Sequence, residues 1–134
     1  YDWECRGFWV NEGPAVLFHG NKLFISYSAS ATDENYCMGL LWIDLNADPQ
    51  NPLNWHKSPR PVFATSYENR QYGPGHNSFT QTPEGEDVLV YHARNYTEIE
   101  GDPLYDPNRH TRLKLVRWDE NGMPDFGIPP ADTL

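Results

Sequence analysis

Two stretches of the sequence, NEGPAVLF at residues 11–18 and GHNSFTQ at residues 75–81, each begin a run of residues typical of a β-strand. Branched and aromatic side chains favour extended backbone. Each run is followed by a glycine-containing turn, at residues 19–22 and 83–86. No segment of useful length has the 3.6-residue apolar period of an amphipathic helix. The sequence therefore predicts an all-β fold in which one pattern of strands starts twice.

The first unit is expected to hold four strands in meander order, at residues 15–18, 23–29, 36–43 and 61–64. The second unit is expected to hold three, at residues 78–81, 87–94 and 111–118. A Pro- and Asn-rich connection precedes the last strand of the first unit, and a long polar loop at 95–109 divides the second.

The two units are related by a constant offset. Three pairs of residues are each 64 positions apart: Tyr27 and Tyr91, Ala29 and Ala93, Glu12 and His76. Repeated four-stranded meanders are the blades of a β-propeller, whose first strands line a central channel. We therefore expect one blade at 12–65 and an incomplete one at 76–134, with Glu12 and His76 facing the same pocket. A jelly roll or sandwich of seven short strands is the structural alternative.

Composition limits the class of protein. The chain has 134 residues, enough for one domain, and a net charge of −9, which disfavours binding to nucleic acid. No apolar run approaches the roughly 18 residues of a membrane span, so we expect a soluble protein of the bacterial cytoplasm or a secreted one. Cys5 and Cys37 are too few for a disulfide framework, and Cys37 is expected to be a buried free thiol.

Three residues are candidates for chemistry. Glu12 lies between the aromatic pair at 8–9 and a Gly-Pro turn, and apolar neighbours favour the neutral form of a carboxyl, which suits a general acid. His76 follows Gly-Pro-Gly, a path that lets another group approach the backbone closely. Arg112 begins the last strand and would point inward in a blade. Each also has a structural interpretation: a solvated Glu, a His bonded within a turn, a solvated Arg. The acidic loop residues fit no calcium-loop signature and are expected to be solvated.

Several ordered segments together resemble glycoside hydrolase family 43, near its α-L-arabinofuranosidase branch. They are residues 11–15, 25–30, 36–40, 72–79, 118–119 and 122–124. The resemblance implies a five-bladed β-propeller and inverting hydrolysis of arabinosides or xylosides, with no cofactor required. Glu12 matches the motif of the general acid. His76 matches a channel histidine that contacts a calcium or other ion through water, and Arg112 falls where a substrate-binding Arg is placed. Tyr72 and Trp9 are expected to contact the sugar.

The family's base Asp and its tuning Asp both lie upstream of the acid Glu, and no Asp of this chain occupies an equivalent position. The chain therefore looks like the C-terminal two-fifths of such an enzyme. We expect the base to come from an N-terminal propeller portion outside this chain, acting on an arabinose- or xylose-containing oligosaccharide. The alternatives are a second copy of the chain that closes a sugar-binding but inactive ring, and an inert truncation product.

Overall fold

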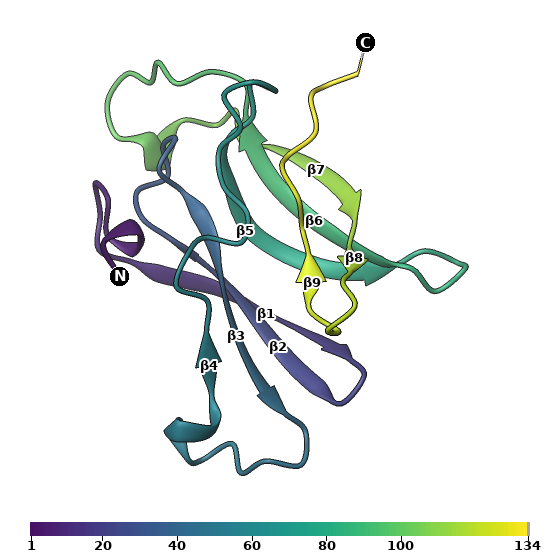
Figure 1. Ribbon diagram of the computed structural model, residues 1–134. Coiled ribbons are helices and arrows are strands. Elements are labelled where there is room, and N and C mark those ends of the chain that lie inside the picture. The colour runs from purple at the N-terminus through teal and green to yellow at the C-terminus, as the bar shows by residue number, and fades with distance from the viewer. Residues whose placement is uncertain (134) are drawn as a thin grey trace.

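The computed structural model describes residues 1–133, which are almost entirely β-strands and loops (Figure 1). The elements in chain order are η1 (Asp2–Glu4), β1 (Asn11–His19), β2 (Lys22–Ala29), β3 (Cys37–Asp44), η2 (Pro52–Asn54), β4 (His56–Lys57), β5 (Tyr72–Gln81), β6 (Asp87–Arg94), η3 (Pro103–Tyr105), β7 (His110–Leu115), β8 (Arg117–Trp118) and β9 (Pro124–Asp125). The three η elements are single 3₁₀ turns, and no α-helix occurs in residues 1–133. The all-β prediction is confirmed. Within that range no helix is long and apolar enough to span a membrane.

The first sheet is antiparallel and has the order β1-β2-β3-β4. Gly20, at φ +56°, supplies the left-handed residue that a tight hairpin between β1 and β2 requires. The β1–β2 register shifts between Glu12 and Ala15, around Gly13 at φ +57°. This irregularity bends the start of β1, where Glu12 lies, away from a regular ladder.

The second sheet has the order β5-β6-β7, and a small β8–β9 hairpin follows it. The pairing of β5 with β6 shifts register twice, between Tyr72 and Gly75 and between Gly75 and Ser78. The Gly-Pro-Gly-His segment therefore lies within strand β5, whereas the sequence predicted a strand that begins only at residue 78. The irregular pairing of this segment with β6 corresponds, in the second sheet, to the irregular start of β1 in the first sheet.

Two predicted strands differ from those observed. The fourth strand of the first sheet is His56–Lys57 and not residues 61–64, of which only Phe63 forms a bridge, to Met38. Pro59 and Pro61 lack the N–H that a ladder needs. The predicted strand at 111–118 is divided into two: β7 ends at Leu115, and Arg117–Trp118 form the separate strand β8, which pairs with β9.

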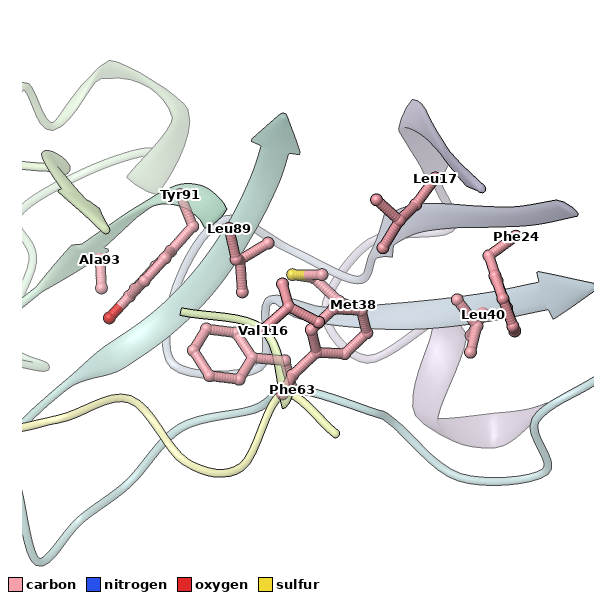
Figure 2. Packing of buried hydrophobic residues seen from close by; sticks show 10 residues of the cluster. Leu17, Phe24, Met38, Leu40, Phe63, Leu89, Tyr91, Ala93 and Val116 are labelled. Carbon is pink, nitrogen blue, oxygen red and sulfur yellow. The ribbon is translucent and has the colours of Figure 1, made fainter. Parts of the chain in front are cut away.

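The core lies between the two sheets. Its buried members are Leu17, Phe24, Met38, Leu40, Phe63, Leu89, Tyr91, Ala93, Val116 and Phe126. Figure 2 shows Leu17, Phe24 and Leu40 of the first sheet approaching Leu89 and Tyr91 of the second across Met38 and Phe63. The β5 strand also packs against β1, β2 and β3. This packing brings the irregular starts of β1 and β5 to the same place. Cys37 is buried and forms no disulfide, as predicted.

We predict that Leu89→Ala lowers the free energy of unfolding by about 2–5 kcal/mol, because Leu89 is fully buried between the sheets and its loss leaves a cavity. Leu53→Ala is the matched control, since Leu53 is 88% exposed and its truncation is expected to cost less than about 0.5 kcal/mol. Urea unfolding measures both. Equal effects of the two substitutions would show that the sheets do not pack through this core.

Candidate active site

Glu12, in β1, and His76, in β5, lie side by side at the junction of the two sheets. His76 Nδ1 is 3.8 Å from Glu12 Oε1, and both side chains are partly exposed. The constant offset of the sequence repeat predicted this meeting. Gly13 makes room for it, because a Cβ there would lie 3.1 Å from the His76 ring. A carboxyl group and an imidazole are thus presented together to solvent.

Tyr36, just before β3, makes the hydrogen bond that holds the carboxyl group. Its hydroxyl donates to Glu12 Oε1 at 2.7 Å and lies 3.5 Å from His76 Nδ1. Burial raises the pKa of the Tyr36 hydroxyl, and the bond to Glu12 raises it further. The group therefore stays protonated and remains a donor. The sequence indicated Tyr36 only as part of a strand and of the 36–40 segment that resembles the family, with no role in the site.

The glycines of the Gly-Pro-Gly-His segment leave space for the Tyr36 ring. A Cβ on Gly75 would lie 2.5 Å from Tyr36 Cε2, which no real contact tolerates. Gly73 has φ +62°, and a Cβ there would lie 2.3 Å from the carbonyl oxygen of Asp33. The close approach predicted at this segment is therefore made by Tyr36 and the turn before it. The His76 amide also donates to Ser28 Oγ at 2.7 Å, which ties β5 to β2.

His92, in β6, lies behind Tyr36. The two rings stack with centroids 5.7 Å apart and an angle of 7° between their planes. Burial lowers the pKa of His92 to about 4, and the neighbouring Arg109 acts in the same direction. His92 is therefore neutral at pH 7. Its Nδ1 is buried and has no hydrogen-bond partner among residues 1–133.

Arg94, at the end of β6, fixes the long loop at 95–109. Its buried guanidinium forms an ion pair with Asp106 at 2.9 Å and donates to the carbonyls of Pro103 and Thr32. Tyr96 donates to both carboxylate oxygens of Asp106 and, more than Arg94, lowers the pKa of that group. In the loop that we expected to be merely solvated, this carboxylate therefore has a structural role.

The fixed loop forms one wall of a hollow that contains Glu12. This hollow has a volume of about 340 Å³ and is lined by Gly7, Phe8, Val10, Glu12, Ser30, Ala31, Thr32, Asp102, Pro103 and Leu104. In Figure 1 the loop, drawn in green, and the N-terminal segment, drawn in purple, lie at the same end of the sheets. A ligand in this hollow would touch apolar walls and Glu12.

A buried carboxylate, Glu4, lies outside this group. Its side chain accepts hydrogen bonds from the Tyr27 hydroxyl and from Lys57 Nζ, both at 2.7 Å. Burial opposes ionisation of Glu4, but hydrogen bonds from Lys57 and Tyr27 outweigh it and lower its pKa. Glu4 is therefore an ionised structural group.

The other predicted site residues form no polar contact with Glu12 in residues 1–133. Arg112, in β7, forms an ion pair with Asp132 and donates to the Ala93 carbonyl. Trp9 is 86% exposed, and Tyr72 packs edge-on against Tyr67 with ring centroids 5.7 Å apart. No hydrogen bond or ion pair within residues 1–133 links Arg112, Trp9 or Tyr72 to Glu12. Their assignment to substrate binding stays a prediction.

Few side chains of residues 1–133 are placed to bind the ion predicted near His76. No group of three or more His, Cys, Asp or Glu side chains within residues 1–133 is arranged to hold a metal. Glu12 and His76 form only a pair, and Tyr36 already bonds the Glu12 oxygen that faces His76. The described residues do not fit a metal held by this chain alone.

Comparisons with known proteins agree on one family. The sequence pattern of glycosyl hydrolases family 43 matches residues 1–124. The chain is 60% identical, over 97% of its length and 27% of the relative, to an extracellular exo-α-(1→5)-L-arabinofuranosidase of Streptomyces avermitilis. It is 53% identical over the same shares to α-L-arabinofuranosidase 43 of Humicola insolens.

A solved structure is similar over the whole chain. The crystal structure of an α-L-arabinofuranosidase from Lactobacillus brevis superposes with a TM-score of 0.96 at 55% identity, over 100% of this chain and 42% of that one. The chain thus spans about a quarter of the length of the two curated relatives, at 27% of each.

The lowered pKa of His92 predicts a stability that depends on pH. As the pH falls below about 6.5, the unfolded chain takes up a proton at this histidine that the folded chain resists until about pH 4. The free energy of unfolding should therefore fall by about 2–3 kcal/mol over this interval on account of His92. In His92→Gln this component is absent, so the variant loses less stability than the wild type on acidification.

Urea unfolding at pH 7, 5.5 and 4 measures the effect. His110→Gln is the control, because His110 is exposed at the start of β7 and its replacement should leave the pH dependence unchanged. Parallel stability curves for His92→Gln and the wild type would contradict the assignment.

Proposed function

The chain belongs to glycosyl hydrolase family 43, and on that premise we propose that it is the acid-bearing portion of an inverting α-L-arabinofuranosidase in which Glu12 is the general acid. The observation that carries the proposal is the position of the Glu12 carboxyl group. Its Oε1 is held by the Tyr36 hydroxyl at 2.7 Å, and Glu12 lines a hollow of about 340 Å³.

This arrangement suits a proton donor. No side chain within residues 1–133 donates a hydrogen bond to Glu12 Oε2. A proton on Oε2 can therefore pass to the glycosidic oxygen of a bound arabinoside. A general acid must lie within hydrogen-bond reach of the atom that it protonates. The partial exposure of Glu12 allows a ligand to come that close.

The reaction needs a second carboxylate. As Glu12 protonates the glycosidic oxygen, the bond from that oxygen to the anomeric carbon breaks. A base takes a proton from a water molecule that attacks the anomeric carbon from the opposite face, which inverts its configuration. In such enzymes the two carboxyl groups lie roughly 6.5–9.5 Å apart. We assign the base to residues outside this chain, which spans 27% of its two curated relatives.

The surface of the chain supports a larger assembly. Val16 and Phe18 of β1 and Leu113 and Leu115 of β7 are exposed apolar residues at the outer strands of the two sheets. Further protein packed there would bury them and cover the unpaired strand edges. We propose that the two sheets are blades of a five-bladed β-propeller whose remaining blades bring the base to Glu12. Secretion is proposed as well, since one relative is named extracellular.

The proposed substrate is a terminal α-L-arabinofuranoside of a plant polysaccharide. The names of the two curated relatives support arabinose as the sugar. The apolar lining beside Glu12, from Phe8, Val10 and Leu104, offers faces on which a sugar ring could pack. Arg112 and Trp9 are also proposed to contact the substrate. For its guanidinium to bind the sugar, Arg112 would have to break its ion pair with Asp132.

We predict that Glu12→Gln, in the complete enzyme, lowers kcat for unactivated arabinosides by about 10²- to 10⁴-fold, because the amide cannot supply the acid's proton. Sugar binding, measured by titration calorimetry, should stay within about threefold of the wild type, since a carboxamide keeps the shape of the carboxyl group.

Glu84→Gln is the matched control. Glu84 is an exposed residue of the turn between β5 and β6, so the same chemical change there should leave kcat unaltered. Hydrolysis by Glu12→Gln at the wild-type rate would show that another group is the acid.

The origin of the base has its own test. We predict that the native mass of the active particle exceeds 15.5 kDa by the mass of an unlike segment, whether that segment is covalently joined or separate. Comparison of native and denaturing mass spectrometry, with peptide mapping, identifies it. Full activity in a particle made only of this chain would contradict an external base.

A further inference from the structure

The geometry points to Tyr36 as a positioning residue: we propose that its hydroxyl holds Oε1 of Glu12 as a hydrogen-bond acceptor and so keeps the acid's proton on Oε2, toward the substrate. This inference rests on the proposed function, since it concerns how Glu12 is presented. It adds a role for a residue outside the Asn-Glu-Gly-Pro motif.

The direction of the hydrogen bond from Tyr36 decides which oxygen of Glu12 bears the proton. A protonated carboxyl group bears its proton on one oxygen and accepts on the other. Because the Tyr36 hydroxyl donates to Oε1 at 2.7 Å, Oε1 is the accepting oxygen and the proton lies on Oε2. His76 Nδ1, at 3.8 Å from Oε1, is beyond hydrogen-bond range and does not compete with Tyr36.

Packing holds Tyr36 rigidly in the position from which it donates to Glu12. Its side chain is fully buried, with the Gly75 backbone against one ring edge and His92 stacked on its face. A donor that packing holds in place needs no rearrangement when the proton moves. The carboxyl group that it holds is itself partly exposed and would otherwise sample several rotamers.

The surrounding charged groups do not replace this bond. His76 of β5 is the one imidazole beside Glu12 in the described chain, and His92 of β6 lies behind Tyr36. Lys57 and Asp102 line hollows that include Glu12 but form no hydrogen bond to it. Within residues 1–133, the Tyr36 hydroxyl is the only side-chain donor to the Glu12 carboxyl group.

The test is Tyr36→Phe in the complete enzyme, which removes the hydroxyl and keeps the ring. Two substrates are compared: an arabinoside with a sugar leaving group, which needs the acid's proton, and one with an activated aryl leaving group, which hardly does. We expect kcat to fall about 10-fold for the first and less than about twofold for the second, with each KM nearly unchanged. The ratio of the two kcat values does not depend on the folded fraction, so partial unfolding cannot produce this result.

Tyr27→Phe is the matched control, because Tyr27 is a buried tyrosine whose hydroxyl also donates to a carboxylate, Glu4, at 2.7 Å. It should leave the ratio of kcat values unchanged even if it lowers stability. An unchanged ratio in Tyr36→Phe, with Glu12→Gln inactive, overturns the positioning role and leaves the proposed function standing. An active Glu12→Gln overturns the proposed function itself.

Discussion

The contact on which the rest of the site depends is the approach of the β5 backbone to the ring of Tyr36. Gly75 lies where any side chain would collide with that ring, and Gly73 admits the carbonyl of Asp33. This packing joins the second sheet to the first at the point where each begins irregularly. Because the ring is held there, its hydroxyl reaches Glu12 and the neighbouring His76 is brought to the same carboxyl group. A β-carbon at Gly75 would push Tyr36, Glu12 and His76 apart.

Two other features keep this junction in place. The apolar core between the sheets, with Leu89 and Met38 fully buried, sets the distance between β1 and β5 farther along the strands. Arg94 ties the 95–109 loop to the Thr32 turn, which precedes Tyr36 by only a few residues. The 95–109 loop that bounds the hollow beside Glu12 is therefore bonded to the turn before Tyr36, the residue that positions the Glu12 carboxyl group.

The parts of the fold that follow from local chemistry were predictable from the sequence. Turn residues and the constant 64-residue offset predicted most strands and the meeting of Glu12 with His76. The fourth strand was misplaced because Pro59 and Pro61 exclude a ladder that the apolar residues beside them suggest. Tyr36 and His92 were missed because an aromatic residue in a strand looks like any core residue until its polar atom is located. The inward position and substrate contact of Arg112 stay predictions from the blade model, and in this structure its side chain pairs with Asp132 in the C-terminal tail.

The central claim is that Glu12, oriented by Tyr36, protonates the glycosidic oxygen. A crystal structure of the complete enzyme with a non-hydrolysable arabinoside analogue tests it most directly. We expect the atom in place of the glycosidic oxygen to lie about 2.6–3.2 Å from Glu12 Oε2 while Tyr36 still bonds Oε1. We also expect a second carboxylate across the anomeric carbon, roughly 6.5–9.5 Å from Glu12. A bound arabinoside whose glycosidic atom lies beside another acid, with Glu12 out of reach, would contradict the central claim.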